Sequence, residues 1–302
     1  MEVGSPTVDQ LRIFLTVAEQ GSFNQAARKL GRALSVVSYG IAALELQLGV
    51  GLFDREGSRR PRLTDAGRAL LADARAVIDE VDGMMARARS VRQGLETELS
   101  LAVDVMVPSA TVAGLLRDFQ ENFPTVNLRL HVEALGAVAA LVLGKQANLA
   151  VAGPDIIDLP ELQRAAVGSV QLVPVASPNH PLAKLNDIPA GEARRHLQLV
   201  LTDRSTLTEG KEFSVISPRT WRLADLGAKH ALLLEGIGWG NMPIHVVTEE
   251  IAQGRLVQLD LPENPPLDYV LHALWRRDNR LGPAASWMLE ALADRWSGPP
   301  IA

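Results

Sequence analysis

The sequence predicts three parts: an N-terminal all-α unit that ends in a basic hairpin, a long helix, and a C-terminal α/β body. Three observations predict this fold class. Apolar residues recur at helical spacing over residues 11–48, a run of arginines follows, and strand-like apolar runs alternate with helical patterns from residue 97 onward. A chain of 302 residues suits about two domains. We place the boundaries at 1–63, 64–94 and 95–302.

The first two predicted helices have clear start and stop signals. Leu11 and Phe14 begin an apolar stripe of helical spacing, and Gly21 ends that helix. Ser22 and Gln25 have the spacing of a capping box, in which the hydroxyl accepts from a first-turn N–H and the amide reaches back. The second helix is therefore expected to begin after Ser22.

The third predicted helix has one inward face and one outward face. The inward face repeats every three or four residues and consists of Val37, Ile41, Leu44 and Leu48. Leu34, Ser35, Ser38 and Tyr39 lie off this stripe, where they could contact DNA. Ala33 has no side chain that can cap a helix, so we expect Ser35 to cap it and shorten it by two residues; a lost cap costs ~1 kcal/mol. The alternative for Leu34 and Tyr39 is packing against the neighbouring helix or hairpin.

The hairpin that follows is rich in arginine. An arginine cluster alone would suit a solvated loop, but three helices followed by a basic hairpin are typical of a winged helix-turn-helix, which presents its third helix to the DNA major groove. The arginines would then grip phosphates. The predicted partner is double-stranded DNA, and the predicted contacts are Ser22, Arg32, Leu34, Ser35, Ser38, Tyr39, Arg55, Arg59, Arg60 and Arg62.

Residues 64–94 predict one long helix that pairs with a second copy of the chain. Thr64 is a suitable N-cap and Gly94 a suitable stop. Apolar residues alternate at steps of four and three, the pattern of a coiled-coil seam; they are Leu70, Ala74, Val77, Val81, Met84, Ala88 and Val91. A helix of roughly 40 Å with such a seam predicts a homodimer through 64–94. The alternative is packing of the seam against its own domain.

Residues 11–67 resemble the LysR-type transcriptional regulators. The family pattern is matched in register by Leu11 and Phe14; Gly21, Ser22, Phe23, Ala26, Ala27 and Leu30; Val37, Ser38, Ile41, Leu44, Glu45, Leu48, Gly49, Leu52, Phe53 and Arg55; and Leu63, Thr64, Ala66 and Gly67. The chain departs from the pattern where the family usually has Gln at Leu34 and a basic or polar pair at Tyr39 and Gly40. The resemblance therefore implies the fold, while the usual base-reading residues do not transfer. It also implies dimers that pair into a homotetramer.

The C-terminal body predicts a parallel α/β sheet. Its strand-like runs are 99–105, 126–135, 147–153, 170–177, 197–202, 255–261 and 267–277. The segments 173–184, 236–247 and 254–261 resemble the effector domain of the same family. That resemblance implies two α/β lobes like those of periplasmic binding proteins, the first at about 97–166 and 270–300 and the second at about 168–268.

An effector site is expected where strands end and helices begin, since ligands of open α/β sheets bind there. Segments 108–111 and 202–205 offer hydroxyls and free N–H groups, and 236–243 is expected to be a Gly-rich turn whose Trp239 adds an aromatic wall. We expect a small organic anion as effector. The predicted contacts are Ser109, Thr111, Glu133, Thr202, Arg204, Trp239 and Asn241; the alternative is that Ser109 and Thr202 are simple caps and Trp239 is a core residue.

Composition points away from an enzyme or a membrane protein. There is no cysteine, no paired histidine spacing for a metal, no nucleophile elbow and no P-loop, so we expect no catalytic residues, no metal and no cofactor. No signal peptide or membrane-spanning run is apparent, which predicts a cytoplasmic protein. The net charge is −5, with the excess of acid in residues 95–302. The alternatives to an effector-controlled regulator are an architectural DNA-binding protein with a non-functional effector cleft, and a solute-binding enzyme with a helical appendage.

Overall fold

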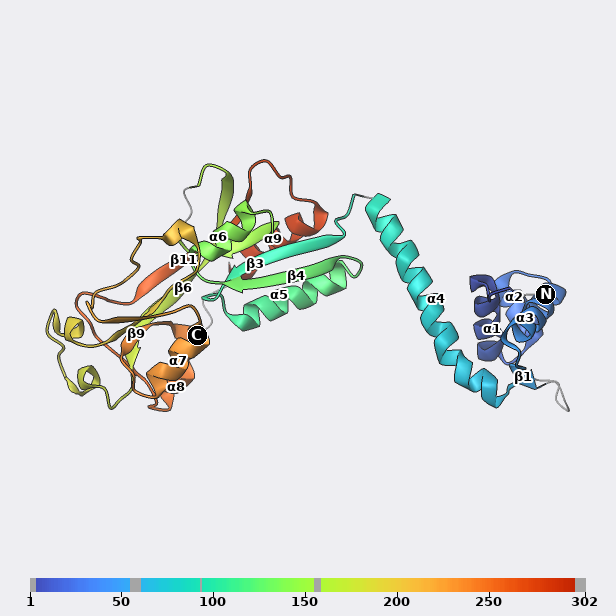
Figure 1. Ribbon diagram of the computed structural model, residues 1–302, viewed down its shortest axis with the longest axis horizontal. Coiled ribbons are helices and arrows are strands. Elements are labelled where there is room, and N and C mark those ends of the chain that lie inside the picture. The colour runs from blue at the N-terminus through green and yellow to red at the C-terminus, as the bar shows by residue number, and fades with distance from the viewer. Residues whose placement is uncertain (1–3, 55–60, 93, 155–158, 297–302) are drawn as a thin grey trace. The chain divides into compact units, whose positions relative to one another are not determined.

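The computed structural model describes residues 4–54, 61–92, 94–154 and 159–296. The chain forms two compact units, Met1–Ser90 and Val91–Ala302, and each is described by itself (Figure 1). None of the helices in the described ranges combines the length and the apolar character that crossing a membrane requires.

The first unit is a bundle of three short helices closed by a small hairpin and the start of a long helix. The helices are α1 (Val8–Gln20), α2 (Phe23–Leu30), α3 (Leu34–Leu48) and α4 (Asp65–Arg92), and the antiparallel hairpin consists of β1 (Phe53–Asp54) and β2 (Arg62–Leu63). Phe14, Val37, Ile41 and Leu44 are all at most 1% exposed and form its core. The apolar spacing seen in the sequence therefore faces inward as predicted.

The short helices begin and end at the residues that the sequence indicated. Gly21 and Gly31 close α1 and α2 with φ of 58° and 64°, a left-handed conformation that glycine adopts without a steric cost. The Ser22 hydroxyl accepts from Gln25 N at 3.4 Å, which confirms Ser22 as the cap of α2. The reciprocal capping box is found one helix earlier, between Thr7 and Gln10.

Helix α4 is divided between a buried first part and an exposed second part. Thr64 Oγ1 accepts from Gly67 N at 2.9 Å, so Thr64 caps the helix as predicted. Ala74 and Ile78 are buried in the core of the first unit. Val77, which lies on another side of the helix from Ile78, and the later seam residue Met84 are 46% and 54% exposed. The alternative of packing against the own domain thus holds for the first turns of the helix only.

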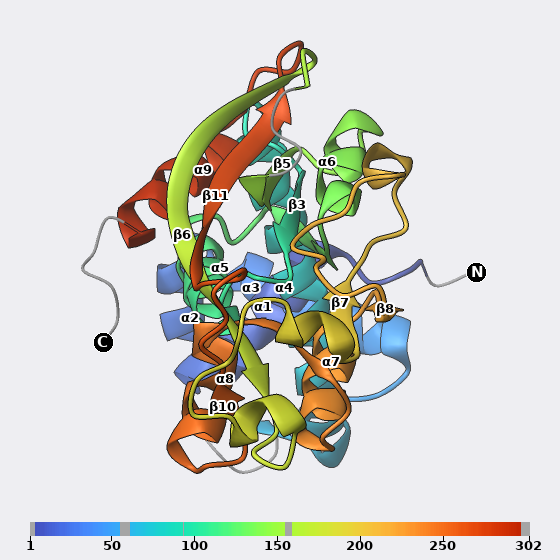
Figure 2. The same ribbon diagram turned by 90° about the vertical axis from the view of Figure 1, so that its left-hand side faces the viewer.

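The second unit is built on one mixed sheet. Its strands are β3 (Glu98–Asp104), β4 (Asn127–Glu133), β5 (Leu149–Ala152), β6 (Leu162–Ala176), β7 (Gln198–Leu201), β8 (Thr220–Leu223), β9 (Trp239–Pro243), β10 (Val257–Gln258) and β11 (Leu267–Arg276). They follow the order β4-β3-β5-β11-β6-β9-β7-β8, with β10 paired to β6. The long strands β6 and β11 run side by side through the unit (Figure 2).

The expectation of a parallel sheet is wrong for the strands at the centre. β3 is parallel to β4 and β5, and β7 is parallel to β8 and β9. However, β11 is antiparallel to both β5 and β6, and β6 is antiparallel to β9 and β10. Apolar runs reveal strands and not their direction, which depends on which strands become neighbours in the folded chain.

The expectation of a Gly-rich turn over 236–243 is wrong in its second half, where strand β9 begins at Trp239. A Cβ on Gly240 would lie 2.6 Å from Leu199 O and 3.1 Å from Lys229 Cε. Glycine is needed here because the strand lies against neighbouring backbone, which is one of its uses within strands. The turn itself is confined to Gly236 and Gly238, whose φ values are 79° and 68°.

Helices cover the sheet in two groups. Helices α5 (Ser109–Asn122) and α9 (Pro283–Trp296) pack on one face of β3, through residues such as Leu101, and α6 (Gly136–Leu143) packs on the opposite face, through Ala102. Helices α7 (Leu226–Leu234) and α8 (Ile244–Ala252) pack on β6, β7 and β9. The two halves of the sheet thus have separate helical layers and share β6 and β11.

Candidate functional site

Helix α3 presents a continuous outer face to solvent. Tyr39 is 76% exposed and Leu34 is 42% exposed, while Ser35 and Ser38 are also exposed. The exposure of Tyr39 contradicts the alternative in which it packs on a neighbouring element. On the inner face, a Cβ on Gly40 would lie 2.8 Å from Ile13 Cδ1, so glycine permits the close packing of α1 on α3.

The start of α3 differs from the expectation. The helix begins at Leu34 and Ala33 occupies the N-cap position with no side-chain hydrogen bond. Ser35 lies inside the first turn and does not cap the helix, so the expected shortening by two residues is wrong. The close packing of Val37 and Ile41 in the core fixes the helix without a capping side chain.

Arg32 is held by an ion pair within the first unit. Its guanidinium donates to both oxygens of Asp9, with Nη1–Oδ2 at 2.5 Å and Nη2–Oδ1 at 2.7 Å. The hydrogen bond from Arg32 is the largest cause of the lowered pKa of Asp9. The Ser22 hydroxyl is likewise engaged in capping α2. Both residues therefore have structural partners in addition to the DNA contact predicted for them.

The hairpin is anchored to the helices by edge-to-face contacts between aromatic rings. The ring centroid of Phe53 lies 5.7 Å from those of Phe14 and Phe23 in edge-to-face geometry, an arrangement that stabilises aromatic pairs. Arg62 pairs with Asp54 in the hairpin register and its side chain is exposed. The other wing arginines of the prediction, Arg55, Arg59 and Arg60, lie outside the described residues.

The second unit contains a cavity of about 310 Å³ to which both halves of the sheet contribute. This volume is at the lower end of the range for small-molecule sites. Its walls are mostly apolar and consist of Met106, Leu135, Pro154, Leu172, Leu199, Val200, Leu201, Phe213 and Leu267. Its polar lining residues are Gln198, Glu212, Ser214, Lys229, Asn241 and Tyr269.

Two lining residues have strained backbones. Leu135 and Ser214 have φ of 49° and 52°, values that are uncommon for residues other than glycine. Such conformations persist where the surrounding structure over-determines them, and they often mark ligand sites. The strain supports a functional role for this cavity.

Lys229 is the polar lining residue that sequence reasoning missed. Its side chain, on α7, is 3% exposed, and Nζ donates to Asn241 O at 2.7 Å. Burial lowers the pKa of Lys229 to about 7. The signal in the sequence was a lysine within an otherwise apolar stretch of α7, and helical spacing alone did not indicate that it faces a cavity.

Asp104 joins the segments that form one edge of the cavity. Its carboxylate accepts from Met106 N at 2.9 Å and from Tyr269 Oη at 3.1 Å, and also from the backbone of Leu135 and Gly153. Burial raises its pKa to about 6, although these hydrogen bonds act in the opposite direction. The end of β3, the start of α6, the end of β5 and strand β11 therefore meet at one buried carboxyl group.

Of the residues predicted to bind the effector, Asn241 lines the cavity. The others do not lie among its lining residues. Ser109 and Thr111 lie in the first turn of α5, while Glu133 and Arg204 have exposed side chains. Thr202 is half-buried just after β7 and follows Leu201, which does line the cavity. The strand ends were the right region, but the side chains that face inward there are different ones.

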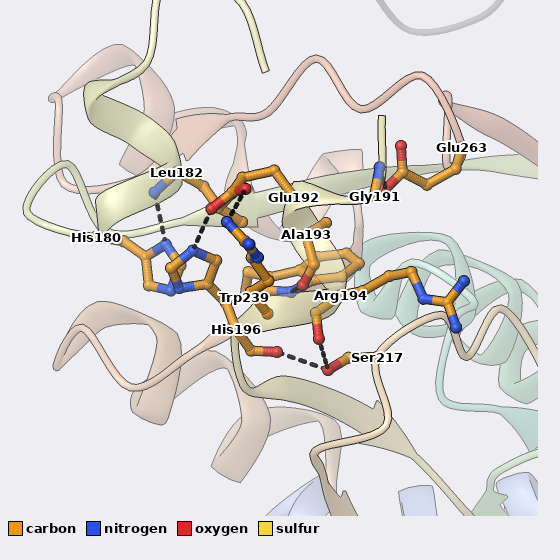
Figure 3. A network of polar contacts seen from close by, with 11 residues as sticks. His180, Leu182, Gly191, Glu192, Ala193, Arg194, His196, Ser217, Trp239 and Glu263 are labelled. Atoms are coloured by element: carbon orange, nitrogen blue, oxygen red, sulfur yellow. Dashed lines mark hydrogen bonds and ion pairs between the residues drawn. The ribbon is translucent and has the colours of Figure 1, made fainter. Parts of the chain in front are cut away.

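The prediction that Trp239 forms an aromatic wall of the effector site is wrong. Trp239 is fully buried, packs with Leu182 and Leu261, and donates from Nε1 to Ala193 O at 3.2 Å (Figure 3). Trp239 does not line the cavity and belongs to a separate core cluster. It is a core residue, which was the alternative.

A polar network supports the loop that covers Trp239. Ser217 Oγ donates to His196 O at 2.7 Å, and Leu182 N donates to His180 Nδ1 at 3.2 Å (Figure 3). Burial, followed by the charge of His196, lowers the pKa of His180 to about 4. Across the described ranges, no group of three or more His, Asp or Glu side chains is placed to hold a metal ion.

Two family models match the chain. Residues 8–68 match the bacterial regulatory helix-turn-helix protein model of the lysR family, and residues 92–297 match the LysR substrate binding domain. The probable HTH-type transcriptional regulator YhaJ of Escherichia coli K12 is 30% identical over 299 residues, which cover 97% of each chain.

Solved structures give the same fold. An OxyR mutant of Corynebacterium glutamicum has a TM-score of 0.55 at 21% identity, covering 97% of this chain and 94% of that one. CrgA, a LysR-type regulator from Neisseria meningitidis, has a TM-score of 0.52 at 22% identity and covers 98% and 100%. From the match of both family models and the full-length similarity to YhaJ, the chain belongs to the LysR family of DNA-binding transcriptional regulators.

Proposed function

We propose that this regulator acts as a homodimer or a homotetramer in the bacterial cytoplasm, that it inserts α3 into the DNA major groove, and that an effector in the cavity of the second unit controls DNA binding. The family consists of transcriptional regulators, which bind DNA and small-molecule effectors and self-associate, and not of enzymes. The observation that carries the proposal is the presence in one chain of an exposed α3 face and a mostly apolar cavity with a buried amine.

The outer face of α3 is proposed to read bases through an unusual set of side chains. Ser35 and Ser38 could accept or donate a hydrogen bond to base edges, while Leu34 suits the methyl group of thymine. Arg62, together with Arg55, Arg59 and Arg60, would bind phosphates from the wing. Ser22 would bind a phosphate at the start of α2, and Arg32 would do so only in competition with Asp9.

The exposed half of α4 is proposed to form the dimer contact. Val77, Met84 and Val91 are 46%, 54% and 52% exposed and recur at steps of seven residues. A helix face of this kind is buried by a second helix with the same repeat. A dimer would present two copies of α3 to successive faces of a two-fold symmetric DNA site.

The second unit is proposed to consist of two lobes, at about 97–166 with 270–300 and at about 168–268. The separate helical layers on the two halves of the sheet support this division, and β6 and β11 would connect the lobes. A ligand that contacts both sides of the cavity would alter their relative position. By thermodynamic linkage, DNA must then change effector affinity by the same factor.

The alternative of an architectural DNA-binding protein with a non-functional cleft is not favoured. The second unit matches the substrate binding domain of the family over nearly its whole length. The cavity is also open to a ligand and is lined by a buried lysine.

The test combines DNA selection with an effector screen. A DNA site is first selected from random sequence by the purified full-length chain, and a library of small organic acids is then screened by thermal shift. An effector at ~100 times its Kd stabilises the protein by about 2.7 kcal/mol. A compound that raises the unfolding temperature and changes affinity for the selected site supports the proposal, and the absence of any selected site contradicts it.

A matched pair of variants tests the wing. Replacing Arg59 and Arg60 with Ala should weaken binding to every DNA sequence alike and flatten the dependence on salt, because fewer phosphate contacts release fewer counter-ions. The control replaces Arg194 and Arg195, two exposed residues of the second unit, with Ala. It should leave the DNA affinity and its dependence on salt unchanged. A loss confined to the selected site would contradict the phosphate-binding role.

A further inference from the structure

Most polar side chains that line the cavity of the second unit already have partners within the protein. Gln198 Nε2 donates to Ser214 O at 2.7 Å, and its Oε1 accepts from the backbone of Ile216 and Ser217 at 3.0 Å. Both hydrogen-bonding atoms of this amide are therefore engaged by the protein. Gln198 therefore serves the wall of the cavity, and its amide oxygen has both acceptor positions filled.

The lining side chains of Asn241, Tyr269 and Glu212 are engaged as well. Asn241 and Asn264 exchange side-chain hydrogen bonds of 2.6 and 3.4 Å. Tyr269 donates to Asp104 at 3.1 Å. Glu212 forms an ion pair with Arg222 at 2.5 Å, and both side chains are about half exposed. Each of these groups already has a hydrogen bond or an ion pair within the protein.

Lys229 is different, because its ammonium group carries three donors and the structure gives it one acceptor, Asn241 O at 2.7 Å. That acceptor is neutral, and no carboxylate among the described residues forms an ion pair with Lys229. The stem of the side chain lies against Gly240, with Cε 3.1 Å from the position of a Cβ there, so the amine is held in place. The lysine is 3% exposed and lines the cavity.

A buried cation without a counter-ion is costly, and a bound anion removes that cost. The walls around the amine are apolar, including Leu199, Leu201 and Phe213. We propose that the ligand of this cavity is a monocarboxylate with an apolar body, and that its carboxylate pairs with Lys229 Nζ while the body packs on the apolar wall. This inference rests on the proposed role of the cavity as the effector site.

Burial is the cause of the low pKa of Lys229, so the charged amine is penalised by desolvation and not by a neighbouring cation. A carboxylate placed beside it would favour the charged form. A single ionic contact surrounded by apolar walls is also the usual way in which small-ligand pockets fix orientation.

The test uses three phenyl compounds of similar size and different charge on the full-length protein. Benzoate, benzamide and benzylamine are titrated by calorimetry against the wild type, Lys229→Met and the control Lys184→Met, in which an exposed lysine is replaced. We expect benzoate to bind the wild type and Lys184→Met, and benzamide and benzylamine to bind each at least tenfold more weakly. In Lys229→Met, benzoate affinity should fall about 30-fold or more, since removal of one partner leaves a buried charge unpaired.

Lys229→Met keeps an unbranched apolar stem, one atom shorter, and removes the amine. Its unfolding temperature establishes that it is folded before binding is measured. ¹³C chemical shifts of carboxyl-labelled benzoate, free and bound, give a second measurement of contact with the amine. Equal affinity for benzoate and benzamide, unchanged benzoate affinity in Lys229→Met, or no binding of benzoate at 10-millimolar levels would each overturn the inference.

The outcomes also separate this inference from the proposed function. A neutral compound that binds the cavity and alters DNA affinity would refute the role of Lys229 and leave effector control intact. Benzoate binding at Lys229 with no effect of any cavity ligand on DNA affinity would support the lysine contact and refute effector control.

Discussion

The two units of this regulator carry their proposed functional groups in opposite ways. In the first unit the groups lie on an exposed helix face, where Tyr39 is 76% exposed. In the second unit the key groups Asp104 and Lys229 are 1% and 3% exposed. An exposed group is positioned by the helix that carries it, whereas a buried ionisable group is positioned by all the segments that pack around it. Local residue spacing therefore predicts the position of the exposed group but not that of the buried group.

The largest expected effect tests whether the first unit needs a partner. Replacing both Val77 and Met84 with Glu should prevent pairing of the exposed half of α4, because like charges would be placed in an apolar contact. Loss of bivalent binding should reduce affinity for a two-fold symmetric DNA site by about 10²–10⁴-fold, measured by fluorescence anisotropy, with mass measured by analytical ultracentrifugation.

The matched control is the double replacement of Ala72 and Ala76 with Glu, which adds the same charge on exposed positions outside the seam. This control should remain dimeric and bind DNA normally. If Val77→Glu/Met84→Glu also remained dimeric, the dimer contact would lie elsewhere in the chain.

The next largest effect concerns how the stability of the second unit depends on pH. Burial lowers the pKa of Lys229 to about 7 from an ordinary value of 10.5. Between these values the unfolded chain binds the proton and the folded chain does not, so stability should rise as pH increases from 7 to 10, on the order of 3 kcal/mol. Urea unfolding of the wild type and of Lys229→Met at each pH measures this rise in the free energy of unfolding.

In Lys229→Met this rise should be absent, and the difference between the two proteins should shrink toward pH 10. Lys184→Met should follow the wild type. Identical pH profiles in Lys229→Met and the wild type would mean that the amine is not desolvated in the folded protein.

A smaller effect tests the hydrogen bonds that converge on the buried carboxyl group of Asp104. A Cβ on Gly153 would lie 1.8 Å from Tyr269 Oη, so Gly153→Ala should displace the tyrosine and break its hydrogen bond to Asp104. We expect a loss of about 2 kcal/mol of stability in the second unit, measured by urea unfolding. Gly144→Ala, where the nearest atom is 3.1 Å away, should cost less; equal losses would mean that Tyr269 moves aside freely.

The smallest effect concerns base recognition by α3. After a DNA site has been selected, thymines within it are replaced one at a time by deoxyuridine, which lacks only the C5 methyl group. Loss of one methyl contact with Leu34 should weaken binding about fourfold, or ~0.8 kcal/mol. In Leu34→Ala the same replacement should have no effect, and a Leu34→Ala protein that still discriminates against uracil would assign the contact to another residue.

Sequence reasoning was accurate in the first unit for a definite reason. Gly21, Gly31 and Thr64 act within a few residues of their own position, so the helix boundaries follow from local chemistry. Ala33 is the exception: a cap was assumed to be necessary, but packing of the inner face of α3 makes the helix stable without one.

In the second unit the strand-forming segments were largely recognised, but the site was not. Strands β8 and β9 were missed because their sequences are short, polar or glycine-containing. Trp239 was assigned to the ligand site because it lies in the expected glycine-rich turn, yet contacts with distant residues such as Leu182 and Leu261 place it in the core. Lys229 was overlooked because nothing in α7 indicates which side of the helix borders a cavity.

The sequence by itself determined the family, the apolar faces of the first three helices and the apolar repeat of α4, because helix periodicity acts over a few residues. Only the tertiary structure decided that the central sheet is mixed, that Trp239 is a core residue, and that Lys229 and Asp104 are buried beside a cavity. These features depend on contacts between segments far apart in the chain, as between Asp104 and Tyr269, and no local pattern specifies them.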